Sequence, residues 1–357
     1  MPSHLLQRRG IELGSFDTDQ VNQSPQKESD WASGKPIFLA GVAHKYLSDN
    51  HQAIARSAQL HAHVVSGKSA EKIFDQPYYV ARWEKHFEAL GSSVNPGAQQ
   101  EIETLFFDAV EDEDILAEDL WVKLSWLSFV EGDNSLRFRF SFGVDHEEDV
   151  AADSKRQTYA AMLAESLFSE SRMITQNEAL VNRLGALLNR ETLQYVERII
   201  YFNAPNGGAY LHHDLERGHA GVVYVQASGQ TLWLALAKSD LLAQIQAHVA
   251  FLDAQQAWPI SIAQSGQQHL RNICSDKRLL SKALDSFNDT ALIHLINETP
   301  EFIQKLIEGG FSYHLRPGDA IVLPQETGSG ETEHNCCWHS VLTIGDQTGE
   351  GLSFAIR

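Results

Sequence analysis

The sequence is poor in cysteine, poor in basic residues relative to acidic ones, and without a long apolar run. Its 357 residues include three cysteines, which cannot form a multi-disulfide framework and favour a reducing, cytoplasmic compartment. Lysine and arginine number 28 against 47 acidic residues, and the formal net charge of −19 argues against a nucleic-acid partner. No apolar stretch reaches the roughly 18 residues of a membrane span, and the N-terminus is too polar for a secretion signal, so we expect no membrane association.

Histidine, in contrast, is abundant, with 16 residues, and two of them, His212 and His339, stand in an informative pattern. In His212-His213-Asp214, a β-strand would point the first and third side chains into one cavity and the second one away. His339, on a second strand far downstream, would complete a set of two histidines and one carboxylate. Such a set covers one face of a divalent metal, leaves the other face open, and is typical of non-haem Fe(II) oxygenases.

The sequence around these motifs favours β-strands. Runs rich in β-branched and aromatic residues alternate with turns that contain Asn, Pro, Gly and Ser. The runs are residues 197–202, 221–226, 231–236, 320–324, 339–344 and 352–356. We therefore predict a β-core that carries both histidine motifs.

In these segments the chain resembles the JmjC-type, cupin-like Fe(II)/2-oxoglutarate oxygenases. The similarity rests on LHHD with the aromatic strand that follows it, and then on LRPGDAIVLP, CWHSVLTIGD and GLSFAIR, in this order. It covers residues 196–239 and 312–357, discontinuously. The resemblance implies a double-stranded β-helix of the cupin or jelly-roll type, with His212, Asp214 and His339 as iron ligands and 2-oxoglutarate as cosubstrate.

One feature of that family is missing here. A Lys or Arg usually follows the hairpin glycine and pairs with the distal carboxylate of 2-oxoglutarate, whereas Thr231 stands in this place and offers only a neutral hydrogen bond. As replacements we consider Arg357 on the final strand first, ahead of Arg139 and Arg137, which share one face of the alternating run 136–142. That arginine face can equally be the solvated side of a half-buried strand.

Along the chain, the pattern predicts an α+β protein in which helices surround the β-core. We expect an irregular N-terminal arm over residues 1–30, a helical region over 31–118 and the β-helix core over 119–357.

Three further elements are expected within the core region. They are an additional hairpin from the runs 121–129 and 136–142, a helical block over 151–195, and a helical insertion over 239–310. An insertion of this size is expected to cover the mouth of a site or to form a homodimer contact. The stretch 325–333, rich in Gly, Ser and Thr, is either a mobile flap or a solvated surface loop.

The first functional hypothesis is therefore a mononuclear Fe(II) oxygenase that uses O₂ and 2-oxoglutarate to hydroxylate or otherwise oxidise a C–H bond of a small molecule, with an amino-acid-derived metabolite favoured. The missing hairpin cation leaves open an iron oxygenase that does not use 2-oxoglutarate, and a protein or peptide side chain is an alternative substrate. A hypothesis of another class is a cupin-type binding protein without catalysis. Metal content, O₂ consumption and dependence on 2-oxoglutarate separate these hypotheses.

Overall fold

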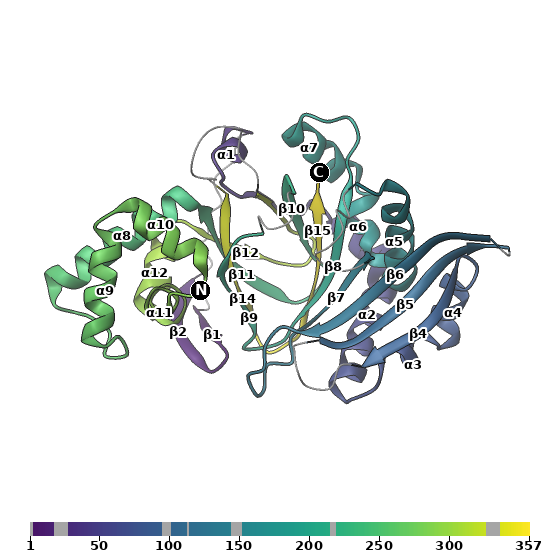
Figure 1. Cartoon of the computed structure of the whole chain (residues 1–357), viewed down its shortest axis with the longest axis horizontal. Coiled ribbons are helices and arrows are strands. Elements are labelled where there is room, and N and C mark those ends of the chain that lie inside the picture. Colours follow the sequence, from purple (N-terminus) through teal and green to yellow (C-terminus); the bar gives the residue numbers. More distant parts are fainter. Residues whose placement is uncertain are drawn as a thin grey trace.

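A computed structural model describes residues 3–17, 28–94, 101–112, 114–143, 152–214, 219–325 and 336–357 of the chain. They form a mixed α+β fold in which the described strand pairs are antiparallel. Two sheets face each other across an inner core, and helices cover the outer face of each sheet (Figure 1). No helix of the described ranges combines the length and apolar character that crossing a membrane requires.

The larger sheet has the strand order β3-β13-β10-β15-β8-β7-β6-β5-β4. Its strands are β3 (Ile37–Leu39), β4 (Phe87–Val94), β5 (Glu101–Glu111), β6 (Asp114–Trp126), β7 (Leu136–Phe142), β8 (Tyr195–Asn203), β10 (Gly221–Gln226), β13 (Ala320–Pro324) and β15 (Gly349–Ile356). Its outer face packs on helices on the right of Figure 1, which follow the apolar periodicity of the sequence. These include α2 (His44–Val65), α3 (Ala70–Phe74), α4 (Pro77–Trp83), α5 (Ser154–Leu167), α6 (Arg172–Thr175) and α7 (Glu178–Leu188), while α1 (Glu28–Ala32) lies near β13.

The smaller sheet has the order β12-β11-β14-β9 and carries both histidine motifs. Its strands are β9 (Gly208–His212), β11 (Gln230–Ala237), β12 (Ser312–Leu315) and β14 (Cys337–Ile344). The helical insertion covers its outer face, on the left of Figure 1. The insertion consists of α8 (Lys238–Gln255), α9 (Gln264–Cys274), α10 (Lys277–Ser286), α11 (Thr290–Glu298) and α12 (Pro300–Glu308).

The inner core joins the two sheets beside the histidine motifs. Tyr224 of β10 and Leu323 of β13 pack there against Trp233 of β11 and Val341 of β14. In the described part of the chain the two sheets remain separate hydrogen-bonded ladders, so the fold is an antiparallel sandwich rather than one continuously bonded barrel.

The N-terminal segment differs from the irregular arm expected over residues 1–30. Residues 3–17 form a hairpin of β1 (Ser3–Arg8) and β2 (Ile11–Asp17), which packs against β14 and α12. Leu6, Leu13 and Phe16 are buried. These few apolar residues lie among many polar ones, so the composition of the segment did not indicate strands. Two short strands of this kind need a partner surface to form.

The region 31–118 is only partly helical. Helices α2, α3 and α4 occupy its first part, but β4, β5 and the beginning of β6 follow and extend the larger sheet. In β5, Leu105, Phe107 and Ala109 are buried at every second position, which is the period of a strand.

The other expected elements are present. Strands β6 and β7 pair as the predicted hairpin. Helices α5 to α7 lie within 151–195, and α8 to α12 occupy the predicted insertion. Of the stretch 325–333 only Gln325 belongs to the described residues, so the flap prediction lies outside them.

Candidate metal centre

The structure brings together the three residues that the sequence singled out. His212 ends β9, Asp214 follows two residues later, and His339 lies directly opposite His212 on β14. Asp214 carboxylate oxygens lie 3.9 Å from Nε2 of His212 and 3.7 Å from Nε2 of His339. One potential ligand atom from each residue lies within 4.8 Å of the others.

These separations are close to those of a single metal site. Ligand atoms bound at about 2.1 Å on one face of an ion lie roughly 3.0 Å apart. The two distances from Asp214 are somewhat longer, so small side-chain rotations bring the three donors to one ion, and two imidazoles with one carboxylate are a donor set that iron(II) accepts. The residues present therefore fit a mononuclear metal centre.

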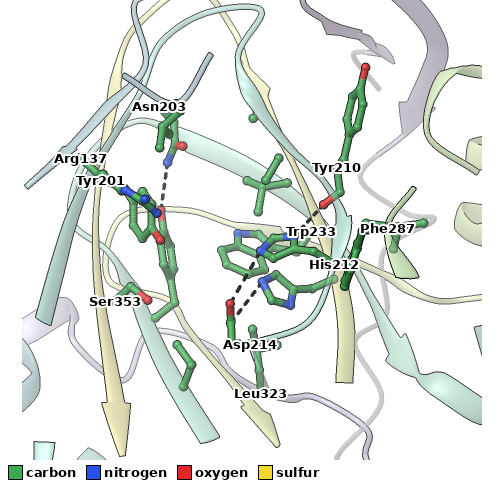
Figure 2. Close-up of a pocket in the computed structure, with 18 of the residues that line it drawn as sticks. Arg137, Tyr201, Asn203, Tyr210, His212, Asp214, Trp233, Phe287, Leu323 and Ser353 are labelled. Atoms are coloured by element: carbon green, nitrogen blue, oxygen red, sulfur yellow. Dashed lines mark hydrogen bonds and ion pairs between the residues drawn. The ribbon is translucent and has the colours of Figure 1, made fainter. Parts of the chain in front are cut away.

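The histidines have their ring nitrogens arranged for coordination. Nδ1 of His212 lies 2.7 Å from the carbonyl oxygen of Tyr210, so it carries the proton and leaves the lone pair on Nε2 (Figure 2). Burial lowers the pKa of His339 well below its usual value, and the neighbouring His212 lowers it further. His339 is therefore neutral at neutral pH, as a metal ligand must be.

His213, between the two ligands, points to the other side. Its ring packs against Trp338 and Phe287, with centroid distances of 5.0 and 5.2 Å. The strand alternation expected from the sequence therefore holds at this position.

A cavity of about 320 Å³ opens beside the three residues. Trp233, Leu323 and Val341 form part of its apolar wall, and Arg137 with Tyr201 lies across the cavity from Phe287 (Figure 2). The cavity is thus mostly apolar with a few polar groups, as is usual for sites that bind small molecules.

The four candidate cosubstrate residues occupy different environments. Arg137 lines the cavity beside Tyr201, and no carboxylate of the described residues pairs with it. Burial raises the pKa of Tyr201, whereas the nearby Arg137 lowers it. Arg137 is therefore a cation of the cavity wall that can meet an acidic group, whereas Arg9, which also lines the cavity, forms an ion pair with Asp133.

The other three candidates lie outside the cavity wall as the structure describes it. Arg139 forms a buried ion pair with Glu197, which lines a separate, smaller cavity together with Asp214. Arg357 exchanges backbone hydrogen bonds with Gln194 beyond the end of β15. Of the four candidates, only Arg137 belongs to the described wall of the cavity.

Thr231 does not line the cavity but supports Trp233, which does. Its buried hydroxyl accepts a hydrogen bond from Nε1 of Trp233 at 3.0 Å and donates one to Gln226 at 2.7 Å. The indole of Trp233 in turn stacks on the ring of His339, with centroids 5.5 Å apart. Thr231 thus helps to orient a metal ligand through Trp233.

Sequence reasoning missed several residues of the cavity. Arg9 comes from the N-terminal hairpin, Tyr210 precedes His212 on β9, and Phe287 comes from the helical insertion. Tyr210 was visible in the motif, because it lies two residues before His212. Neither Arg9 nor Phe287 carried a local signal, since their place in the wall depends on long-range packing.

Comparisons with known proteins give no close relative. No protein family and no curated protein matches the sequence. Among solved structures, the Escherichia coli ribosomal oxygenase YcfD is similar with a TM-score of 0.27 and 10% identity over 79% of this chain and 43% of that one. An oxidoreductase of the 2OG-Fe(II) oxygenase family from Burkholderia pseudomallei has a TM-score of 0.29 and 11% identity over 94% of this chain and 92% of that one. The chain thus spans less than half of the E. coli structure.

Proposed function

We propose that this protein is a mononuclear non-haem Fe(II) oxygenase that uses 2-oxoglutarate and O₂ to oxidise a C–H bond of a small molecule. The observation that carries the proposal is the cluster of His212, Asp214 and His339 beside a mostly apolar cavity. Three protein ligands on one side leave coordination positions for substrate-derived groups on the other. Bound iron(II) would supply the activation of O₂, while the protein determines which bond is exposed to it.

The fold is compatible with this proposal. We interpret the two facing antiparallel sheets as the double-stranded β-helix expected from the sequence, with the ligands on β9 and β14 and the cavity between the sheets. The cavity of about 320 Å³ lies at the lower end of the range for small-molecule sites, which favours a metabolite over a folded protein substrate.

Arg137 is proposed as the partner of the distal carboxylate of 2-oxoglutarate. Burying a carboxylate without a partner costs several kcal/mol, so a cosubstrate with two carboxylates needs a cation in addition to the metal. Arg137 projects into the cavity from β7, and its guanidinium can hold a carboxylate through two hydrogen bonds.

The experiment that tests the proposal combines metal content with cosubstrate kinetics. The purified protein should bind one Fe(II) per chain and convert 2-oxoglutarate to succinate and CO₂ with consumption of O₂. Arg137→Ala should raise the KM for 2-oxoglutarate at least tenfold, equivalent to about 1.4 kcal/mol, without loss of bound iron.

Arg357→Ala is the matched control and should leave this KM unchanged, because Arg357 lies outside the cavity wall. An unchanged KM in Arg137→Ala would refute the role of Arg137. Oxygen consumption that needs a substrate but no 2-oxoglutarate would instead support the iron oxygenase without this cosubstrate, and a protein that binds no Fe(II) would refute the proposal.

A further inference from the structure

The pairing of β9 with β14 contains a one-residue bulge at the metal centre. Ala209 lies opposite Val341, and the next aligned pair is His212 opposite His339. Between these pairs β14 has one residue, whereas β9 has two. An uninterrupted ladder would place Leu211, instead of His212, opposite His339.

This bulge decides which side chain reaches the metal. Residues directly opposite each other in an antiparallel pair point to the same face of the sheet, and a shift of one residue turns a side chain to the other face. Without the bulge, Leu211 would share the face of His339, and His212 would point away from it. Bulges are frequent beside active sites for this reason, because they re-aim a side chain within a regular sheet.

The bulge also removes backbone groups from the ladder, and specific side chains satisfy them. The amide of Leu211 donates to Oδ1 of Asn297 on α11 at 2.7 Å. The carbonyl of Ala209 accepts from Oγ of Ser340 and from Nη1 of Arg8, both at 2.8 Å. Since β9 is an edge strand of its sheet, no further strand of the described fold is available to replace these bonds.

Arg8 contacts all three of the residues Ala209, Asn297 and Ser340. Its side chain is buried, and besides Ala209 it donates to Oγ of Ser340 at 2.8 Å and to the backbone carbonyl of Asn297. The guanidinium also lies over the ring of Tyr210, 4.5 Å from its centroid. One residue of the N-terminal hairpin thus contacts both ligand strands and the helix behind β9.

We propose that Arg8, Asn297 and Ser340 are positioning residues that hold the bulge of β9 and thereby turn His212 toward His339. The consequence for metal binding rests on the function proposed above, whereas the position of the bulge can be tested without a metal. A buried guanidinium suits this place, because it donates several fixed hydrogen bonds to oxygens from different elements.

Cross-linking tests the register directly. In an otherwise unchanged protein, His212→Cys combined with His339→Cys should form a disulfide under diamide, and Leu211→Cys with His339→Cys should not. Adding Arg8→Met should lower the yield of the first bond at least about threefold and allow the second. Peptide mass spectrometry distinguishes these bonds from any that Cys336 or Cys337 forms. The same yields with and without Arg8→Met would overturn the proposal.

Metal affinity provides the second readout, with Co(II) as the probe. Arg8→Met should weaken Co(II) binding at least about tenfold, as is common when the support of a ligand is removed. The control is Phe16→Leu, which disturbs the same hairpin through a buried ring that stacks on His4, away from β9, and should change the affinity less than twofold.

If Arg8→Met does not fold, Ser340→Ala removes one donor to Ala209 and should weaken Co(II) binding about threefold. Unchanged affinity in the folded variants would show that these residues only stabilise the hairpin. Failure of the unaltered protein to bind Co(II) would contradict the metal site, while the cross-linking result would still decide the register.

Discussion

The two strands that carry the metal ligands are held in different ways. β14 pairs with a strand on each side, and all of its residues are buried. Among the described strands, β9 pairs on one side only, and it contains a bulge. The side chain of His212 is 36% exposed, against 5% for His339.

This difference shows two ways of placing a ligand. General packing of the sheet and of Trp233 fixes His339, so the core that folds the protein also positions this side chain. His212 lies on an edge, where the ladder supplies fewer hydrogen bonds, and it depends on side chains from the hairpin and the insertion. Stability and metal binding should therefore be linked at β14 and separable at β9.

The largest expected effect comes from removing each histidine in turn. His339→Ala and His212→Ala should each weaken metal binding at least about 100-fold, because each removes a direct ligand. His339→Ala should also lower the free energy of unfolding of the metal-free protein by about 2–3 kcal/mol through the cavity it leaves, whereas His212→Ala should cost less than about 1 kcal/mol. Metal titration and urea denaturation measure the two quantities.

The control for both variants is His213→Ala, which should retain the metal because its ring lies on the opposite face. Equal loss of stability in the two ligand variants would contradict the distinction between the strands. Retention of metal in either would remove that residue from the ligand set.

A smaller effect is expected from weakening the support of β14. Trp233→Phe removes the indole hydrogen bond to Thr231 and should lower the free energy of unfolding by about 1–2 kcal/mol. Metal affinity should change less than about threefold, because β14 remains paired on both sides. Calorimetry and Co(II) titration provide the measurements. A tenfold loss of affinity would show that His339 is as dependent on one neighbour as His212.

The smallest expected effect is on the pH dependence of folding stability, through a histidine that packs on the N-terminal hairpin. Burial lowers the pKa of His314 on β12 from 6.5 to about 4, and its ring packs on Phe16. The unfolded chain takes up this proton near pH 6.5 while the folded protein resists until about pH 4, so stability is lost as the pH falls through this interval.

His314→Gln should reduce the loss of stability between pH 7 and pH 5 by about 1 kcal/mol and keep a donor for Gln230. Denaturation of the metal-free protein at the two pH values measures it. His248, whose pKa burial lowers to about 4, adds a loss of the same sign that the variant retains. An identical pH dependence in the variant would show that His314 does not contribute.

The metal ligands could be predicted because their signal is local. His212 and Asp214 lie two residues apart. Runs of β-branched and aromatic residues, typical of strands, surround both them and His339. Which face of β9 meets His339, however, depends on the register with β14, and the bulge that sets it has no signature in the sequence. The pattern therefore predicted the three residues that the structure brings together, but not the bulge that aligns His212 with His339.

The cavity wall and the N-terminal hairpin were harder to predict. Alternation placed Arg137 and Arg139 on one face of β7, but only the positions of their neighbours show that one faces the cavity and the other an ion pair with Glu197. Arg8 lies in a polar segment, and its partners are distant in sequence. Such contacts follow from tertiary packing and leave no periodic trace.

The contact of Arg8 with Ser340 also bears on how the protein matures during synthesis. The two residues are separated by 332 positions, so the first strand of the hairpin is synthesised long before β14, the strand that carries Ser340. At roughly 5–20 residues per second, a ribosome needs about 17–66 s to produce the intervening segment. Throughout this time the apolar face of the hairpin has no partner on β14, and β9 lacks Ser340 and its link to Arg8. The metal centre can therefore form only after translation has passed β14.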